Sequence, residues 1–139
     1  MANKEFNLKL NASYKDDKNT IDALSILVKT DNGWEDLNLD IRSPGFLLFI
    51  NGLFSCQHLY MRINSAECGV ILESSEGELN ITTNDNWEIQ SAKINFTAKI
   101  KSGTLSESNL TYIIERMKHC PVSSNLPKHI NLQNRVSFI

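Results

Sequence analysis

The sequence lacks long apolar runs and a leader-like beginning, and these two absences exclude several classes of protein. Its longest unbroken apolar stretch covers residues 46–50, whereas a membrane-spanning helix needs about 20 apolar residues. The chain begins Met-Ala-Asn-Lys-Glu-Phe, without the basic segment and apolar run of a signal peptide. We therefore expect a cytoplasmic protein that does not associate with membranes.

Cysteine is scarce and irregularly spaced. The three cysteines are Cys56, Cys68 and Cys120. Thiols stay reduced in the cytoplasm, and an odd count without CxxC spacing argues against a disulfide scaffold or a structural zinc site. The three histidines share no metal-ligand spacing, and we interpret them as polar surface or rim residues: His58, His119 and His129. We predict no metal site and no cofactor.

An excess of positive charge is also missing. The chain has 14 Lys and Arg against 16 Asp and Glu, for a net charge of -2. Because phosphate recognition needs clustered Lys and Arg, this balance excludes nucleic acid as the main partner. The 139 residues, 41% of them hydrophobic, fit a single domain over residues 1–139 that can bury a core without metal or disulfide staples.

Alternating apolar residues predict strands near both ends and in the middle of the chain. Residues 6–14 alternate, residues 23–29 form a second apolar run, and residues 37–41 alternate again. Because Asp31-Asn32-Gly33 is a hairpin signal, we expect these three strands to form an antiparallel meander. Further strands are predicted near residues 78–82, 92–100 and 130–139.

Two segments show helical patterns instead. Residues 46–66 are apolar on nearly every face, and Gly69 can end this helix in the left-handed conformation. Ser106 is a candidate N-cap for a second helix, which Pro121 ends. The order of three strands, helix, strands, helix and strand predicts an α+β fold. A helix that is apolar all round must be buried all round, so we expect a second copy of the chain to cover it in a homodimer.

Two stretches that carry cysteines resemble the signatures of the OsmC/Ohr family. In the first, a proline-led turn at Ser43-Pro44-Gly45 opens the long helix that carries Cys56. In the second, a helix ends in Cys120-Pro121-Val122-Ser123 before a final strand. The resemblance covers the order of elements along the whole chain. It implies an OsmC-like fold, in which antiparallel sheets pack on a long buried central helix of an intertwined homodimer.

The same resemblance implies a thiol-dependent peroxidase that acts on small apolar organic hydroperoxides. Cys56 would attack the peroxide as a thiolate and become a sulfenic acid. Cys120 would condense with that sulfenic acid to form a disulfide, which a dithiol reductant would reopen. We therefore predict that mild oxidation joins Cys56 to Cys120 and leaves Cys68 free.

A charged helper residue is expected beside Cys56, because burial alone raises the pKa of a thiol. In active family members an arginine has this role, and a glutamate at the start of the central helix holds it. The only arginine before Cys56 is Arg42, so we expect Arg42 near Cys56 if the chain is an enzyme. No acidic residue lies between Asp40 and Cys56. This gap keeps an alternative open: a non-catalytic or redox-sensing OsmC-like homodimer that binds a small apolar ligand.

Overall fold

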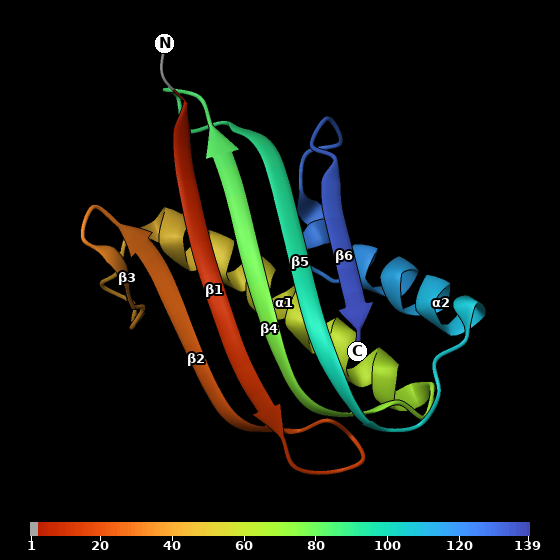
Figure 1. Ribbon diagram of the computed structural model, residues 1–139. Helices are drawn as coiled ribbons and strands as arrows, with labels where there is room; N and C mark the ends of the chain where they lie inside the picture. The colour runs from red at the N-terminus through yellow and green to blue at the C-terminus, as the bar shows by residue number, and fades with distance from the viewer. Residues whose placement is uncertain (1–2) are drawn as a thin grey trace.

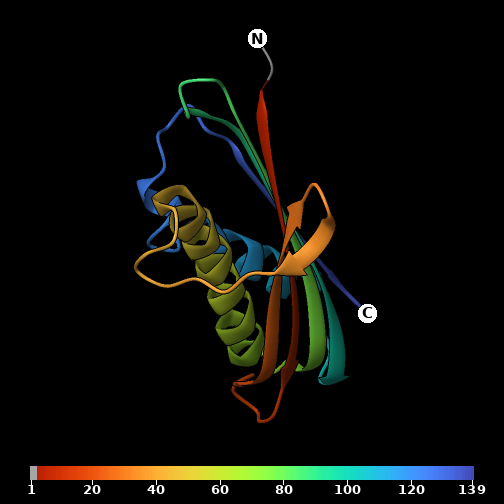
Figure 2. The ribbon, with the colours of Figure 1, turned by 90° about the vertical axis from the view of Figure 1, so that its left-hand side faces the viewer.

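The computed structural model describes residues 3–139, which form six strands and two α-helices. The strands are β1 (Lys4–Tyr14), β2 (Ile21–Thr30), β3 (Gly33–Asp36), β4 (Ile71–Thr83), β5 (Ile89–Ser102) and β6 (Leu132–Phe138). The helices are α1 (Gly45–Glu67), α2 (Glu107–Lys118) and a short 3₁₀ turn, η1 (Ser123–Asn125). Both long helices lie on one face of a single sheet (Figures 1 and 2). The predicted α+β class is confirmed.

The strands follow the order β3-β2-β1-β4-β5-β6 across the sheet. All neighbouring pairs are antiparallel except β5 and β6, which run parallel because α2 and η1 carry the chain back between them. The predicted meander is present as β1, β2 and β3, but its third strand was predicted at the wrong residues. Residues 33–36 form that strand, directly after the hairpin turn, and residues 37–41 do not. Leu37 packs against the core and donates its backbone N–H to Ile26, whereas Ile41 at the other end of the segment is 93% exposed.

The two faces of the sheet differ because side chains alternate along each strand. On β5, the buried residues are Ala92, Ile94, Phe96 and Ala98, and the exposed ones between them are Lys93, Asn95, Thr97 and Lys99. The buried set packs beneath the helices with Leu8, Leu10, Leu79 and Ile81 of the neighbouring strands. The core therefore lies between one face of the sheet and the two helices.

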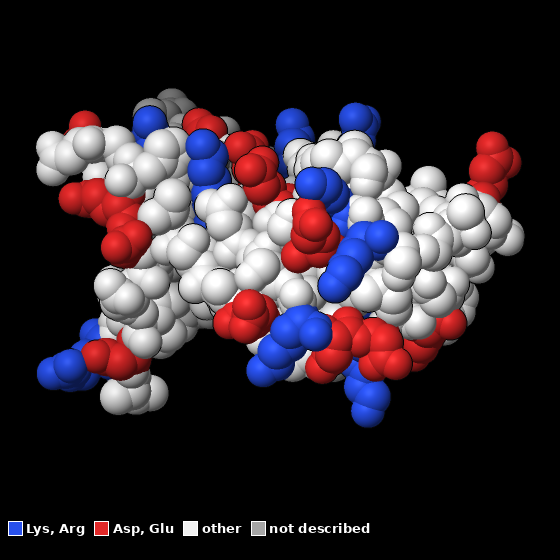
Figure 3. Space-filling view, turned by 60° about the horizontal axis from the view of Figure 1, so that its bottom comes forward, with Lys and Arg blue, Asp and Glu red and all other residues white. Residues whose placement is uncertain are grey.

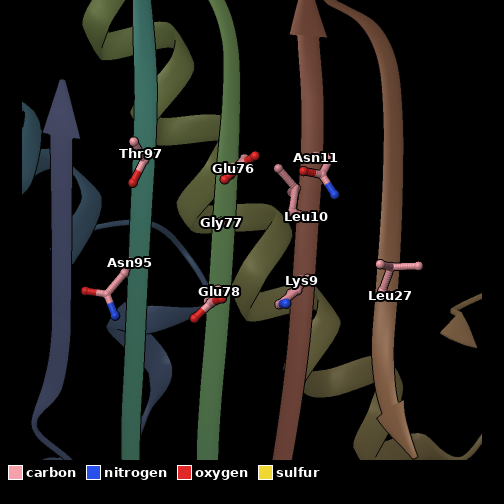
Figure 4. A pocket seen from close by; sticks show the side chains of 9 residues that line it. All are labelled: Lys9, Leu10, Asn11, Leu27, Glu76, Gly77, Glu78, Asn95 and Thr97. Atoms are coloured by element: carbon pink, nitrogen blue, oxygen red, sulfur yellow. The ribbon is translucent and has the colours of Figure 1, made fainter. Parts of the chain in front are cut away.

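The outer face of the sheet is polar and carries a shallow hollow of about 500 Å³ over β1, β2, β4 and β5. Figure 4 shows its side chains standing on the side of the strands away from α1, among them Lys9, Glu76, Glu78 and Asn95. No cysteine or histidine lines this hollow. Its polar residues are the solvent-facing half of the strand alternation, so we assign no chemistry to it.

Charged side chains of both signs are intermingled on the face that Figure 3 shows. One such pair joins Lys99 Nζ and Glu73 Oε2 at 2.7 Å, with both side chains more than half exposed. Phosphate backbones require a concentrated positive surface, and this face does not present one. Among the described residues, no helix is both long enough and apolar enough to cross a membrane.

The central helix α1 begins directly after Pro44, and the chain leaves it through Gly69, whose φ of 76° is the left-handed conformation predicted for this glycine. Its fully buried apolar side chains face the sheet: Ile50, Leu53, Phe54 and Met61. The opposite side of the helix points away from the sheet (Figure 2). Within one chain α1 is therefore covered by the sheet and by α2, and its remaining side is left open.

Candidate thiol site

The two cysteines of the signature stretches come together where α1 packs against α2. Cys56 lies midway along α1, and Cys120 lies two residues beyond the end of α2. Their thiols are close enough for each to shift the pKa of the other. The sulfur of Cys56 is half-buried, whereas Cys120 is 0% exposed. A small molecule arriving from solvent therefore reaches Cys56 first.

Several hydrogen-bond donors surround the sulfur of Cys120. Nε2 of Gln57 lies 3.2 Å from it, the hydroxyl oxygen of Ser123 lies 3.1 Å away, and the backbone nitrogen of Ser123 lies 3.4 Å away. Burial by itself raises the pKa of Cys120, but hydrogen bonds from Cys56, Ser123 and Gln57 outweigh this effect. The pKa of Cys120 consequently lies below the ordinary thiol value.

The pKa of Cys56 is shifted in the opposite direction. Burial raises its pKa to about 11, and the neighbouring Cys120 adds to the increase. The backbone N–H of Val122 acts in the other direction, but more weakly than burial. No lysine or arginine within residues 3–139 is among the groups that shift this pKa. Alone in its protomer, Cys56 is a protonated thiol at neutral pH.

Arg42 is the candidate residue that the structure does not bring to the thiols. It lies in the turn before α1, where its guanidinium bonds to both carboxylate oxygens of Asp40, with the NH2–Oδ2 pair at 2.8 Å. Its side chain is 87% exposed. An ion pair this exposed contributes little to stability. It also supplies no positive charge to Cys56.

Cys68 lies apart from the thiol pair, at the C-terminal cap of α1. Its backbone N–H bonds to the carbonyls of Asn64 and Ser65 as the helix ends. Burial and the nearby carboxylate of Glu67 raise the pKa of the Cys68 thiol. The structure gives this thiol no partner in the site, in keeping with its unassigned role.

His58 is not the surface or rim residue that we expected. It is 3% exposed and faces the sheet, where its Nε2 lies 2.7 Å from the hydroxyl of Tyr14 and its ring stacks on Phe96. The Tyr14 hydroxyl also bonds to Oγ of Ser75 at 2.5 Å. Burial, followed by the charge of Arg62, lowers the pKa of His58 to about 3. Because His58 follows Cys56 by two residues, it lies on nearly the opposite face of α1, which places this polar network inside the core.

Sequence reasoning also missed Gln57 and Asn134. Gln57 is 0% exposed, and its amide joins three elements, because it contacts Cys120, the carbonyl of Met117 and Asn134 on β6. A glutamine in the middle of a strongly apolar helix is itself a signal, since a buried amide requires partners. Asn134 gave no such signal, because its strand pattern leaves it indistinguishable from a solvent-facing residue.

The arrangement is suited to thiol–disulfide chemistry and offers little to a metal. Two neighbouring thiols can be joined by oxidation when their Cα atoms come within about 7 Å of each other. Among residues 3–139, no three His, Cys, Asp or Glu side chains form a group that could hold a metal ion. The chemistry that this chain's own residues support is therefore that of the sulfur pair.

Known proteins resemble this chain in fold but not in sequence. A scan against protein-family models finds no match, and a search of curated proteins finds none either. Among solved structures, an OsmC-like protein from Mycoplasma pneumoniae is 12% identical, with coverage of 94% of this chain and 95% of that one and a TM-score of 0.57. An OsmC-like hydroperoxide resistance protein from Jannaschia sp. is 16% identical, with coverage of 88% and 86% and a TM-score of 0.57.

A third solved structure agrees with these two. A protein from Psychrobacter arcticus, described as a putative osmotic stress induced and detoxification response protein, is 16% identical, with coverage of 90% and 92% and a TM-score of 0.56. Such low identities establish a shared fold and not a shared activity. The OsmC-like fold predicted from the two cysteine signatures is thereby confirmed.

Proposed function

From the OsmC-like fold of this chain, we propose that it is a thiol-dependent peroxidase of the OsmC/Ohr type. It reduces small organic hydroperoxides through Cys56 and Cys120 and is recycled by a dithiol reductant. The observation that carries this proposal is the contact between the two thiols, which come from helices far apart in the sequence. The hydroperoxide resistance named for the Jannaschia structure supports the same chemistry.

The two thiols have different roles because their exposure differs. Half-buried Cys56 meets the peroxide, and its sulfur bonds to one peroxide oxygen while the alcohol leaves. Cys120, which is 0% exposed, then attacks the sulfenic acid on Cys56, so that a disulfide forms and water is released. A dithiol returns the disulfide to two thiols by exchange.

A turnover assay with cumene hydroperoxide and dithiothreitol tests this function. We expect the parent protein to consume the peroxide and Cys56→Ser to be inactive. Cys120→Ser should stop at the sulfenic acid on Cys56. Cys68→Ser is the matched control, because it removes a thiol outside the site, and it should keep full turnover. Peptide mapping after one equivalent of peroxide should find Cys56 joined to Cys120, and a parent protein that consumes no peroxide would refute the proposal.

The protein acts as a homodimer in this proposal, because the uncovered side of α1 is an apolar stripe. The stripe consists of Phe49, Gly52, Cys56, Leu59 and Ile63, whose spacing of three and four residues places them on one helix face. Phe49 is 42% and Leu59 40% exposed, and a Cβ at Gly52 would meet no atom within 4 Å. Because Cys56 belongs to this stripe, the second copy would border the thiol site.

Sedimentation of the parent protein and of two variants tests the dimer. Leu59→Glu places a charge in the middle of the stripe and should yield monomers. Trp34→Glu is the control, since Trp34 is also partly exposed, at 36%, but lies on the outer face of the sheet, where it stacks with Lys9. A parent protein that stays monomeric at micromolar concentration would rule out the homodimer.

One observation favours a second candidate, a redox-sensing or non-catalytic homodimer that binds a small apolar ligand. The pKa of Cys56 is raised to about 11 and Arg42 is engaged with Asp40. A protonated thiol reacts slowly with peroxides. If the thiol pair forms its disulfide with peroxide only over hours and shows no steady turnover, this second function replaces the first.

A further inference from the structure

The hydrogen-bond directions around Cys120 show which of the two sulfurs accepts. The side-chain amide of Gln57 has two N–H groups at Nε2, which lies 2.6 Å from the carbonyl oxygen of Met117 and 3.2 Å from the Cys120 sulfur. The carbonyl can only accept, so one N–H points to it and the other to the sulfur. The backbone N–H of Ser123 also can only donate. The sulfur of Cys120 thus accepts from both groups, while its contact with the Ser123 hydroxyl at 3.1 Å can run in either direction.

Asn134 fixes the orientation of this amide from the other side. Its Nδ2 donates to Oε1 of Gln57 at 3.2 Å. A Gln57 amide turned by half a rotation would set its oxygen against the carbonyl of Met117 and its nitrogen against the donor of Asn134. Because both contacts would then be repulsive, the donor side of Gln57 stays on Cys120.

Cys56 is the thiol neighbour of Cys120, and each of the two thiols shifts the pKa of the other. Burial and contacts with Cys56, Ser123 and Gln57 are the main causes of the shift in the pKa of Cys120. Two groups that can only donate therefore point at the sulfur of Cys120: the side-chain amide of Gln57 and the backbone N–H of Ser123. Hydrogen bonds to an anion are about twice as strong as those between neutral groups, so this arrangement favours a thiolate at Cys120.

We propose that Cys120 carries the resting negative charge of the pair and is the proton acceptor that activates Cys56, with Gln57 as the positioning residue that holds the charge in place. The proposal rests on the peroxidase function proposed above and specifies how its first step is activated. It also suits a protomer in which no lysine or arginine is among the groups that shift the pKa of Cys56, since the charge is placed on the buried sulfur and stabilised by dipoles.

The proton and electron balance is complete with the two thiols and the peroxide. As the sulfur of Cys56 attacks the outer peroxide oxygen, its proton passes to the Cys120 thiolate, the O–O bond breaks, and the departing alkoxide takes that proton to become an alcohol. Cys56 is oxidised to the sulfenic acid and the peroxide is reduced. Cys120, again a thiolate, then attacks the Cys56 sulfur, forms the S–S bond and expels hydroxide, which a solvent proton converts to water.

Titration of single-cysteine proteins tests the charge assignment without any peroxide. The double variant Cys56→Ser/Cys68→Ser retains Cys120, and Cys68→Ser/Cys120→Ser retains Cys56. Ultraviolet thiolate absorbance against pH should show Cys120 ionising at lower pH than Cys56. Adding Gln57→Met to the Cys120 protein should reduce the thiolate about tenfold at a pH below its midpoint, the size expected for one lost hydrogen bond to a charge.

Two further variants separate positioning from general damage to the fold. Asn134→Ala should shift the Cys120 curve in the same direction as Gln57→Met but less, because it acts through the Gln57 amide. Gln133→Met, an exposed neighbour on the same strand, should leave the curve in place. Circular dichroism identifies variants that fail to fold. Cys56 ionising before Cys120, or a curve that Gln57→Met does not move in a folded protein, would overturn the charge assignment.

The proton-acceptor role has its own measurement in the rate at which Cys56 becomes a sulfenic acid. In Cys120→Ser this first step should slow by about a hundredfold at neutral pH, the low end for a lost general base, and recover as the pH rises. A Cys120→Ser protein with the parent's first-step rate would overturn the role. A parent protein that does not react with peroxide would refute the peroxidase function and this role together, while the titration would still decide where the charge lies.

Discussion

Acidification should destabilise this protein through His58, which is buried in a neutral form. Its pKa is lowered from the usual 6.5 to about 3 by burial and by the charge of Arg62. Above pH 6.5 the ring is neutral in both the folded and the unfolded chain and adds no pH dependence. Below 6.5 the unfolded chain binds a proton that the folded chain excludes until the pH approaches 3. The free energy of unfolding therefore falls as the pH falls through this window.

The magnitude follows from the size of the pKa difference. Each unit of pH below the unfolded pKa costs about 1.4 kcal/mol, so His58 alone should remove roughly 3 kcal/mol of stability between pH 6.5 and pH 4. That is a large share of the 5–15 kcal/mol, approximately, that stabilises a typical domain. His58→Gln is the informative variant, because its amide can reach the hydroxyl of Tyr14 and does not titrate.

Urea denaturation at a series of pH values measures the effect. The free energy of unfolding of the parent should fall more steeply below pH 6.5 than that of His58→Gln. The difference between the two slopes separates the contribution of His58 to the pH dependence from that of the carboxylates. His129→Gln, at an exposed histidine, is the matched control and should follow the parent. Parallel curves for the parent and His58→Gln would show that His58 is not held neutral by the fold, and the reasoning from its burial would fail.

Three further substitutions test other parts of the structure. Gly77→Ala puts a Cβ 2.7 Å from Cε1 of Phe96, so it should lower the free energy of unfolding by about 1–3 kcal/mol. Gly45→Ala is the control, because a Cβ there meets no atom within 4 Å and should not lower it. Equal denaturation midpoints for the two variants would contradict this prediction. Asn19→Ala removes buried bonds to three backbone groups and should cost about 3 kcal/mol; a loss below about 1 kcal/mol would show that these bonds are replaced by water. Arg42→Ala should leave the thiolate titration of Cys56 unchanged, and a shifted midpoint would show that Arg42 does act on the pKa of Cys56.

The elements of this fold were predictable wherever a repeating pattern meets a local stop signal. The strict alternation over residues 92–100 gave β5, and the apolar segment between Pro44 and Gly69 gave α1. Ser106 caps α2 as expected, with its side chain accepting from the backbone N–H of Asn109. Residues 37–41 show the limit of this approach, because Leu37 packs against the core as its pattern suggests, but the segment forms no strand and Ile41 is 93% exposed.

The sequence by itself determined the fold, because hydrophobic period, caps and turns act over a few residues and two short signatures marked where the cysteines lie. Only the tertiary structure decided how the thiols differ. A pKa depends on the atoms within a few ångströms of the sulfur, and for Cys120 these come from α1, the turn at Ser123 and, through the Gln57 amide, from β6. The same reason explains His58 and Arg42: which helix face meets the sheet, and which carboxylate a guanidinium reaches, are settled only when distant segments pack together.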